Sequence, residues 1–228
     1  GVYVGSSPAG PGSSGAESEE STNFEYGIRY TSNVLRGELI AFRSNYDNLL
    51  GRCRASDADC NIGQEFSGGK VEVSGIELVG QGEVWLNSNW LLTSNLNYTF
   101  SKSKFKSTFF SQFSQWGLVR RGDELPYIPE HVGRFQVSLE SDEWALDLAL
   151  KYQHEMREEP GSGPITEGLK TDSLTTIDLA ITRFLTDDLD LKMMIRNAVD
   201  NSAIVSHRPY GARPNLPRTL LAQIKYRF

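Results

Sequence analysis

Apolar and polar side chains alternate with a period of two residues in one segment of this chain after another. In residues 144–152 one face carries Trp144, Leu146, Leu148, Leu150 and Tyr152. This period is typical of a β-strand with one apolar and one polar face. Six further segments show it: 24–30, 90–100, 135–139, 177–181, 189–195 and 219–228. Segments 34–47 and 69–80 are strand-like but less regular. No segment has the pattern of an amphipathic helix, so the sequence predicts an all-β fold of about nine antiparallel strands. The apolar row changes face near Gly75, which predicts a β-bulge there.

The lengths of the strands and of their connections favour a membrane. Several rows approach the ~9–11 residues that a tilted strand needs to cross a bilayer, whereas strands of soluble proteins average nearer ~5–6. Short connections (31–33, 81–88, 141–143, 186–188) alternate with long ones (49–68, 102–130, 156–171, 199–215). Barrels of the outer membrane have short periplasmic turns and long extracellular loops. The alternation of short and long connections therefore predicts an antiparallel, up-and-down segment of a transmembrane β-barrel.

The side chains on the two faces fit the same interpretation. Aromatic residues lie at both ends of the apolar rows, as they do at the two membrane interfaces: Tyr30, Trp90, Trp144, Tyr226 and Phe228 at the short-turn ends, and Phe24, Phe100 and Tyr152 at the long-loop ends. Charged residues occupy the opposite face, and we expect them to line a wet lumen: Glu25, Arg29, Asp147, Lys151, Asp178, Asp190, Lys192 and Arg196.

Other function classes are less well supported. A soluble β-sandwich that binds a ligand shows the same alternation, and a small passive channel shares the membrane pattern. The net charge of -6 and the pI near 5.2 argue against a nucleic-acid partner. There is no serine-nucleophile motif, no glycine-rich phosphate loop and no zinc-protease motif, so we expect neither an enzyme nor a cofactor or metal site.

The number of crossings indicates part of a longer chain. If residue 228 ends on the periplasmic side, about nine crossings place residues 1–22 outside the cell. Bacterial barrels of one chain have an even number of strands, and an open arc exposes two unpaired edges that hydrocarbon does not tolerate. We therefore expect further strands upstream of residue 1.

Several segments resemble the TonB-dependent outer-membrane receptors, in particular the ferric-citrate and siderophore type. They begin with residues 1–8 and continue with EESTNFEYGIRY (19–30), FRSNYDNL (42–49), GKVEVSGIE (69–77), NLNYTF (95–100), NAVDN (197–201) and PRTLLAQIKYRF (217–228). The resemblance covers essentially the whole chain through the order and spacing of these segments.

The resemblance implies a specific architecture and function. Residues 1–228 would be the C-terminal part of a 22-stranded barrel in the outer membrane of a Gram-negative bacterium, with the plug domain and the earlier strands absent. The complete receptor would import ferric citrate or a siderophore with energy delivered by TonB through that plug. The terminal Phe228 would be recognised by the barrel-assembly machinery, and outer-membrane lipid would surround the strands.

The long connections hold the candidate functional residues. Cys53 and Cys60 are the only cysteines, and both lie in the connection 49–68, where an oxidising exterior predicts a disulfide. Planar arginine side chains bind the carboxylates of an anionic chelate in bidentate fashion. The candidates for this role are Arg120, Arg121, Arg157, Arg208 and Arg213, with Gln115, Trp116 and Tyr210 as neutral partners. The three histidines, His131, His154 and His207, form no site in the sequence.

Overall fold

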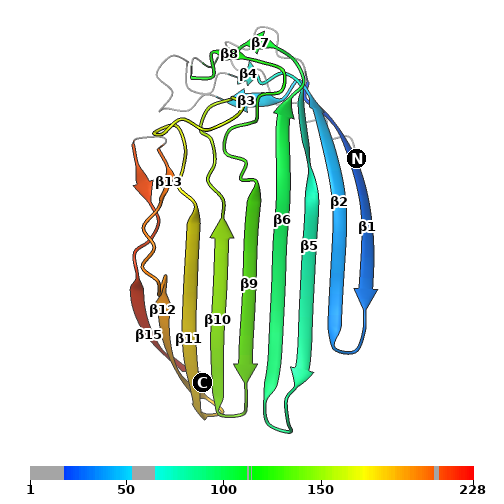
Figure 1. The fold of residues 1–228 in the computed structure, drawn as a ribbon. Coiled ribbons are helices and arrows are strands. Elements are labelled where there is room, and N and C mark those ends of the chain that lie inside the picture. Colours follow the sequence, from blue (N-terminus) through cyan, green and yellow to red (C-terminus); the bar gives the residue numbers. More distant parts are fainter. Residues whose placement is uncertain (1–17, 53–64, 112, 114, 208–210) are drawn as a thin grey trace.

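Nine long strands pair into one antiparallel sheet in the computed structural model, which describes residues 18–52, 65–111, 113, 115–207 and 211–228 (Figure 1). Neighbours in the sheet follow chain order: β1 (Glu20–Thr31), β2 (Leu35–Asp47), β5 (Val71–Trp85), β6 (Leu91–Phe105), β9 (His131–Glu140), β10 (Trp144–Gln153), β11 (Leu174–Thr186), β12 (Leu189–Arg196) and β15 (Thr219–Tyr226). The prediction of an all-β, up-and-down arrangement is confirmed.

Short and long connections lie at opposite ends of this sheet (Figure 1). The long ones carry three small hairpins: β3 (Leu50–Arg52) with β4 (Glu65–Ser67), β7 (Phe109–Phe110) with β8 (Leu118–Val119), and β13 (Ile204–Ser206) with β14 (Arg213–Pro214). Two strands are longer than the sequence predicts. β5 continues to Trp85, so its turn is 86–90 instead of 81–88, and β6 runs five residues past Phe100. In the described ranges the structure has no helix that is long and apolar enough to span a membrane.

Apolar residues stay on one face of the sheet because the cross-strand register keeps them there. Leu148 of β10 pairs with Val137 of β9 and with Leu179 of β11, and Leu179 pairs with Ile195 of β12. The apolar rows remain uncovered: Leu148 is exposed and Ile224 of β15 is 73% exposed. Within the described residues no second sheet packs on these rows, as a β-sandwich would require.

The expected bulge at Gly75 is wrong. Gly75 pairs with Phe42 of β2 and with Ser101 of β6, and neither register shifts there. The apolar row changes face because the surroundings of the strand change. Near its start Val71 belongs to a buried cluster with Phe105, Val119 and Leu125, which joins the sheet to the long connection 106–130. The sheet's register shift lies instead between Phe184 and Thr186 of β11.

Gly75 is required for a close approach between strands. A Cβ atom at this position would lie 2.0 Å from the backbone oxygen of Phe100 and 2.8 Å from the Phe42 ring. We expect Gly75→Ala to lower the free energy of unfolding by about 1–3 kcal/mol, because a rigid backbone must move. Thermal unfolding of the complete receptor in detergent measures the change. Gly80→Ala is the matched control, since its Cβ would lie 3.6 Å from Leu96; equal melting of the two variants would contradict the prediction.

Candidate functional site

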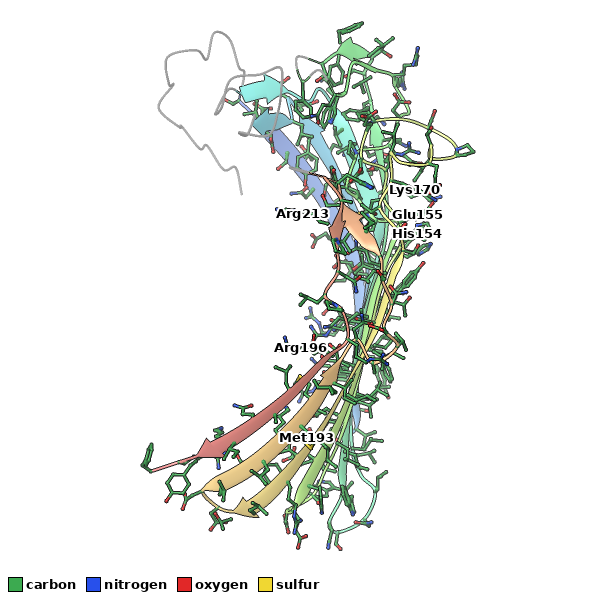
Figure 2. All side chains as sticks on the ribbon, turned by 90° about the vertical axis from the view of Figure 1, so that its left-hand side faces the viewer. His154, Glu155, Lys170, Met193, Arg196 and Arg213 are labelled. Carbon is green, nitrogen blue, oxygen red and sulfur yellow. The ribbon has the colours of Figure 1, made fainter. Side chains whose placement is uncertain are left out.

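The polar face of the sheet forms a hollow of about 740 Å3 on strands β6 to β12. Seen edge-on, the sheet is bowed, and Arg196 and Arg213 lie on its concave side (Figure 2). Charged and amide side chains gather in the hollow because every second residue of each strand points into it: Asn95, Arg134, Asp147, Lys151, Asp178, Lys192 and Arg196. Asn197, directly after β12, also lines it. Five of the charged residues that the sequence assigns to a lumen therefore share this hollow.

Most charges in the hollow are compensated by a neighbour. The Lys151 ammonium lies 2.9 Å from a carboxylate oxygen of Asp178, whose other oxygen accepts a hydrogen bond from the backbone N–H of Asn197 at 2.9 Å. Asp147 accepts a hydrogen bond from Ser138 at 2.8 Å and lies 3.7 Å from the Lys192 ammonium. These groups give the concave face a polar surface, which is suited to contact with water.

Arg134 of β9 stands apart from this pairing. Its guanidinium is exposed in the hollow and makes no hydrogen bond or ion pair with the described residues. Its cross-strand partner is Lys151, so two cations lie side by side on β9 and β10. Arg134 is not among the residues predicted from the sequence, although its alternation with Phe135 is the signal that places it on the polar face. The pair is suited to contact an anion that enters from the loops.

The loop arginines are exposed where the structure describes them. Arg120 and Arg121 follow β8, and both are exposed. Their backbone N–H groups donate to the Asp123 carboxylate at 2.8 Å and to the Thr108 hydroxyl at 3.0 Å. Arg213 is exposed in β14. No hydrogen bond or ion pair between described residues joins Arg213 to the other two. Four predicted residues lie outside the described residues: Cys53, Cys60, Arg208 and Tyr210.

Arg157 has a different environment from the other loop arginines. It is buried, its Nε atom lies 2.7 Å from a carboxylate oxygen of Glu124, and it donates to the backbone oxygen of Gly163 at 3.0 Å. The connections 106–130 and 154–173 are thereby joined. The Arg157 side chain holds loops together, so it has little freedom to contact a ligand.

The neighbouring Glu158 joins three connections at once. Its side chain is 4% exposed and accepts hydrogen bonds from the Tyr127 hydroxyl at 3.0 Å and from the His207 backbone N–H at 2.9 Å. The Nδ1 atom of His207 lies 2.8 Å from the other carboxylate oxygen. The connections 106–130, 154–173 and 197–218 are thus joined at this end of the sheet. Local sequence patterns did not predict it, because the partners are 31 and 49 residues from Glu158.

One cation of the same connections lies on the opposite, convex side of the sheet (Figure 2). The Lys170 ammonium is 3.0 Å from Glu155 and 3.5 Å from Glu167. The hydrogen bond that the Lys170 ammonium donates to Glu155 is the main reason that the pKa of Lys170 is raised above its ordinary value, and the charges of both carboxylates add to it. Lys170 therefore stays charged and ties the two ends of this connection together.

Known proteins share this architecture. The vitamin B12 transporter BtuB of Photobacterium profundum is 23% identical over 92% of this chain. Solved structures with the same fold include the ferric-catecholate import receptor Fiu of E. coli K12 (TM-score 0.67, 19% identity, 96% of this chain) and the ferric yersiniabactin uptake receptor FyuA of Yersinia pestis (0.66, 17%, 92%). The ferric citrate transporter FecA is equally similar (0.67, 17%, 92%).

The match to a family covers most of the sequence, whereas each relative is much longer. The chain spans 30% of the length of the B12 transporter and of Fiu and FyuA, and 31% of FecA. The family model described as "TonB dependent receptor-like, beta-barrel" matches residues 3–201. The chain therefore belongs to the TonB-dependent receptor β-barrel family, whose members are transporters of the Gram-negative outer membrane and not enzymes.

Proposed function

We propose that this chain supplies the C-terminal strands and extracellular loops of a receptor that imports a ferric chelate, either ferric citrate or a siderophore. The observation that carries the proposal is one bowed sheet whose convex face is apolar and exposed and whose concave face is charged. Arg134 and Lys151 on that face and the exposed loop arginines suit a ligand rich in carboxylates or other anionic oxygens.

The two edges of the sheet support a longer protein. β1 and β15 each pair with one neighbour among the described strands. Unpaired edge groups are not tolerated in hydrocarbon, so further strands must close the barrel. We propose that these strands precede β1 together with a plug domain, through which TonB delivers energy. We also propose that the barrel-assembly machinery recognises Phe228. A passive channel made by this sheet alone would have to close its own edges.

Uptake by cells that express the complete receptor tests the proposed function. We expect accumulation of radioactive iron from ferric citrate or from one siderophore class, and its loss when TonB is deleted. Labelled vitamin B12 belongs in the same panel, because one relative carries that name. Uptake that persists without TonB would favour the passive channel, and B12 uptake without iron uptake would replace the proposed ligand.

The loop arginines are tested in the same assay. We expect the combined replacement of Arg120, Arg121, Arg208 and Arg213 by alanine to weaken binding of the chelate about tenfold or more, the loss of roughly one charge-assisted hydrogen bond. Arg218 is the control, since its side chain is engaged with Asp200 at 3.2 Å at the base of its loop. Uptake by the combined variant with unchanged affinity would exclude these arginines as ligand contacts.

A further inference from the structure

On the convex face the apolar surface ends abruptly toward the long connections. The last mainly apolar row crosses five paired strands through Tyr26, Ala41, Ile76, Phe100 and His131. Two residues further along the strands, the paired row on the same face contains Phe24, Arg43, Ser74 and Lys102. Because a strand rises about 3.4 Å per residue, these cations lie only about 7 Å beyond the apolar band.

The next row adds a carboxylate that holds cations in place. Asn45 pairs with Glu72, and Glu72 pairs with Lys104. The Glu72 side chain is 6% exposed, and its oxygens lie 2.8 Å from the Lys104 ammonium, 2.9 Å from that of Lys106, and in contact with Arg43. The four residues Arg43, Lys102, Lys104 and Lys106 are called the outer cationic cluster below.

The outer cationic cluster keeps a positive charge and an accessible surface. Its four cations face two carboxylates, Glu72 and Glu130, the latter 3.5 Å from Lys102. The Lys102 side chain is 67% exposed, and Arg43 and Lys104 are more than half exposed. Glu72 thus holds the ammonium and guanidinium groups close together while these groups remain accessible from outside the sheet. The whole chain carries a net charge of -6, so a general surplus of basic residues does not produce the cluster.

The position of the cluster identifies the ligand chemistry. It faces the membrane, at the long-loop end, directly above apolar and aromatic side chains. An outer-leaflet glycolipid places anionic phosphates at this height and acyl chains below them. Lys102 also lies 5.5 Å from the centre of the Phe100 ring, so charge and apolar surface are continuous. We propose that the outer cationic cluster binds the phosphates of lipid A while the acyl chains lie along the apolar row beneath it.

This proposal rests on the family's outer-membrane location and does not depend on which chelate is imported. A free phosphate ion would bind to the cations alone and would make no contact with the apolar row. The neighbouring pair of Lys70 and Asp47, 2.9 Å apart, compensates its own charge and adds little to the attraction.

Titration of the purified complete receptor with bis-phosphorylated lipid A, followed by native mass spectrometry, tests the proposal. We expect the double variant Lys102→Gln with Lys106→Gln to bind it about tenfold more weakly, since two phosphate-binding charges are lost while Arg43 and Lys104 still hold Glu72. Dephosphorylated lipid A should bind wild type and variant equally. The matched control is Arg36→Gln with Lys225→Gln, which removes two cations from strands β2 and β15 outside the cluster and should leave binding unchanged.

Three results would overturn the proposal. They are equal binding of lipid A by the double variant and the wild type, equal weakening in the control variant, and displacement of lipid A by millimolar inorganic phosphate, which would identify a simple anion site. Should the double variant fold poorly, Lys102→Gln alone changes an exposed side chain and is expected to weaken binding about threefold. Uptake of the chelate, measured on the same variants, separates a failure of this proposal from a failure of the proposed function.

Discussion

Replacing Leu148 with arginine is expected to lower strongly the amount of folded receptor in the outer membrane. Leu148 lies near the middle of β10 on the convex face, between the apolar partners Val137 and Leu179. An arginine facing lipid at mid-depth costs ~2–4 kcal/mol, a large part of a total stability of about 5–15 kcal/mol. The amount of heat-modifiable, folded receptor in outer-membrane fractions measures the effect.

The neighbouring residue provides the control. Ala149→Arg introduces the same side chain one position further along β10, on the face that lines the hollow. Its cross-strand partners there are Gln136 and Asp178, so the new cation remains hydrated and meets a carboxylate. We expect nearly normal levels of this variant. If positions 148 and 149 tolerated arginine equally well, or were equally sensitive, the assignment of the two faces to lipid and lumen would be wrong.

The strands and their faces could be predicted because the period of two is a local property that pairing preserves. When Leu148 pairs with Leu179, the alternation of one strand aligns with that of the next, and apolar rows form across the sheet. The prediction failed where the surroundings change along one strand. Val71 is buried against the loops while Ile76 faces outward, and alternation alone cannot separate such a change from a bulge.

The structure of the long connections could not be predicted for a related reason. Their stability depends on contacts between residues far apart in sequence, such as Val71 with Val119 in the buried cluster and Tyr127 with Glu158. A charged residue in a loop is usually solvated, and nothing near Arg157 or Glu158 in the sequence indicates that both are buried. The position of the charged residues on the concave face, by contrast, could be predicted, because it depends only on the alternation within each strand.

The second large effect is expected at Glu158. Glu158→Ala removes the buried acceptor of the hydrogen bonds from the Tyr127 hydroxyl and the His207 backbone N–H, and the contact with His207 Nδ1. With roughly 1 kcal/mol for each of three bonds, the loss is on the order of 3 kcal/mol, which corresponds to about a hundredfold rise in the open population. Hydrogen exchange of the backbone amides of residues 202–207 in the complete receptor measures this rise.

Glu167→Ala is the control for the lost charge, because Glu167 lies in the same connection, is 87% exposed and is 3.5 Å from Lys170. An exposed pair of this kind contributes about 0–1 kcal/mol, so exchange at 202–207 should stay near the wild-type rate. Equal exchange in both variants would contradict a joining role for Glu158.

The contacts of Glu158 matter for the ligand because Tyr127 lies in the connection that carries Arg120 and Arg121, and His207 lies in the one that carries Arg213. Glu158 therefore sets the spacing between the two groups of arginines, and a chelate held by both should lose affinity in Glu158→Ala although no contact to it was removed.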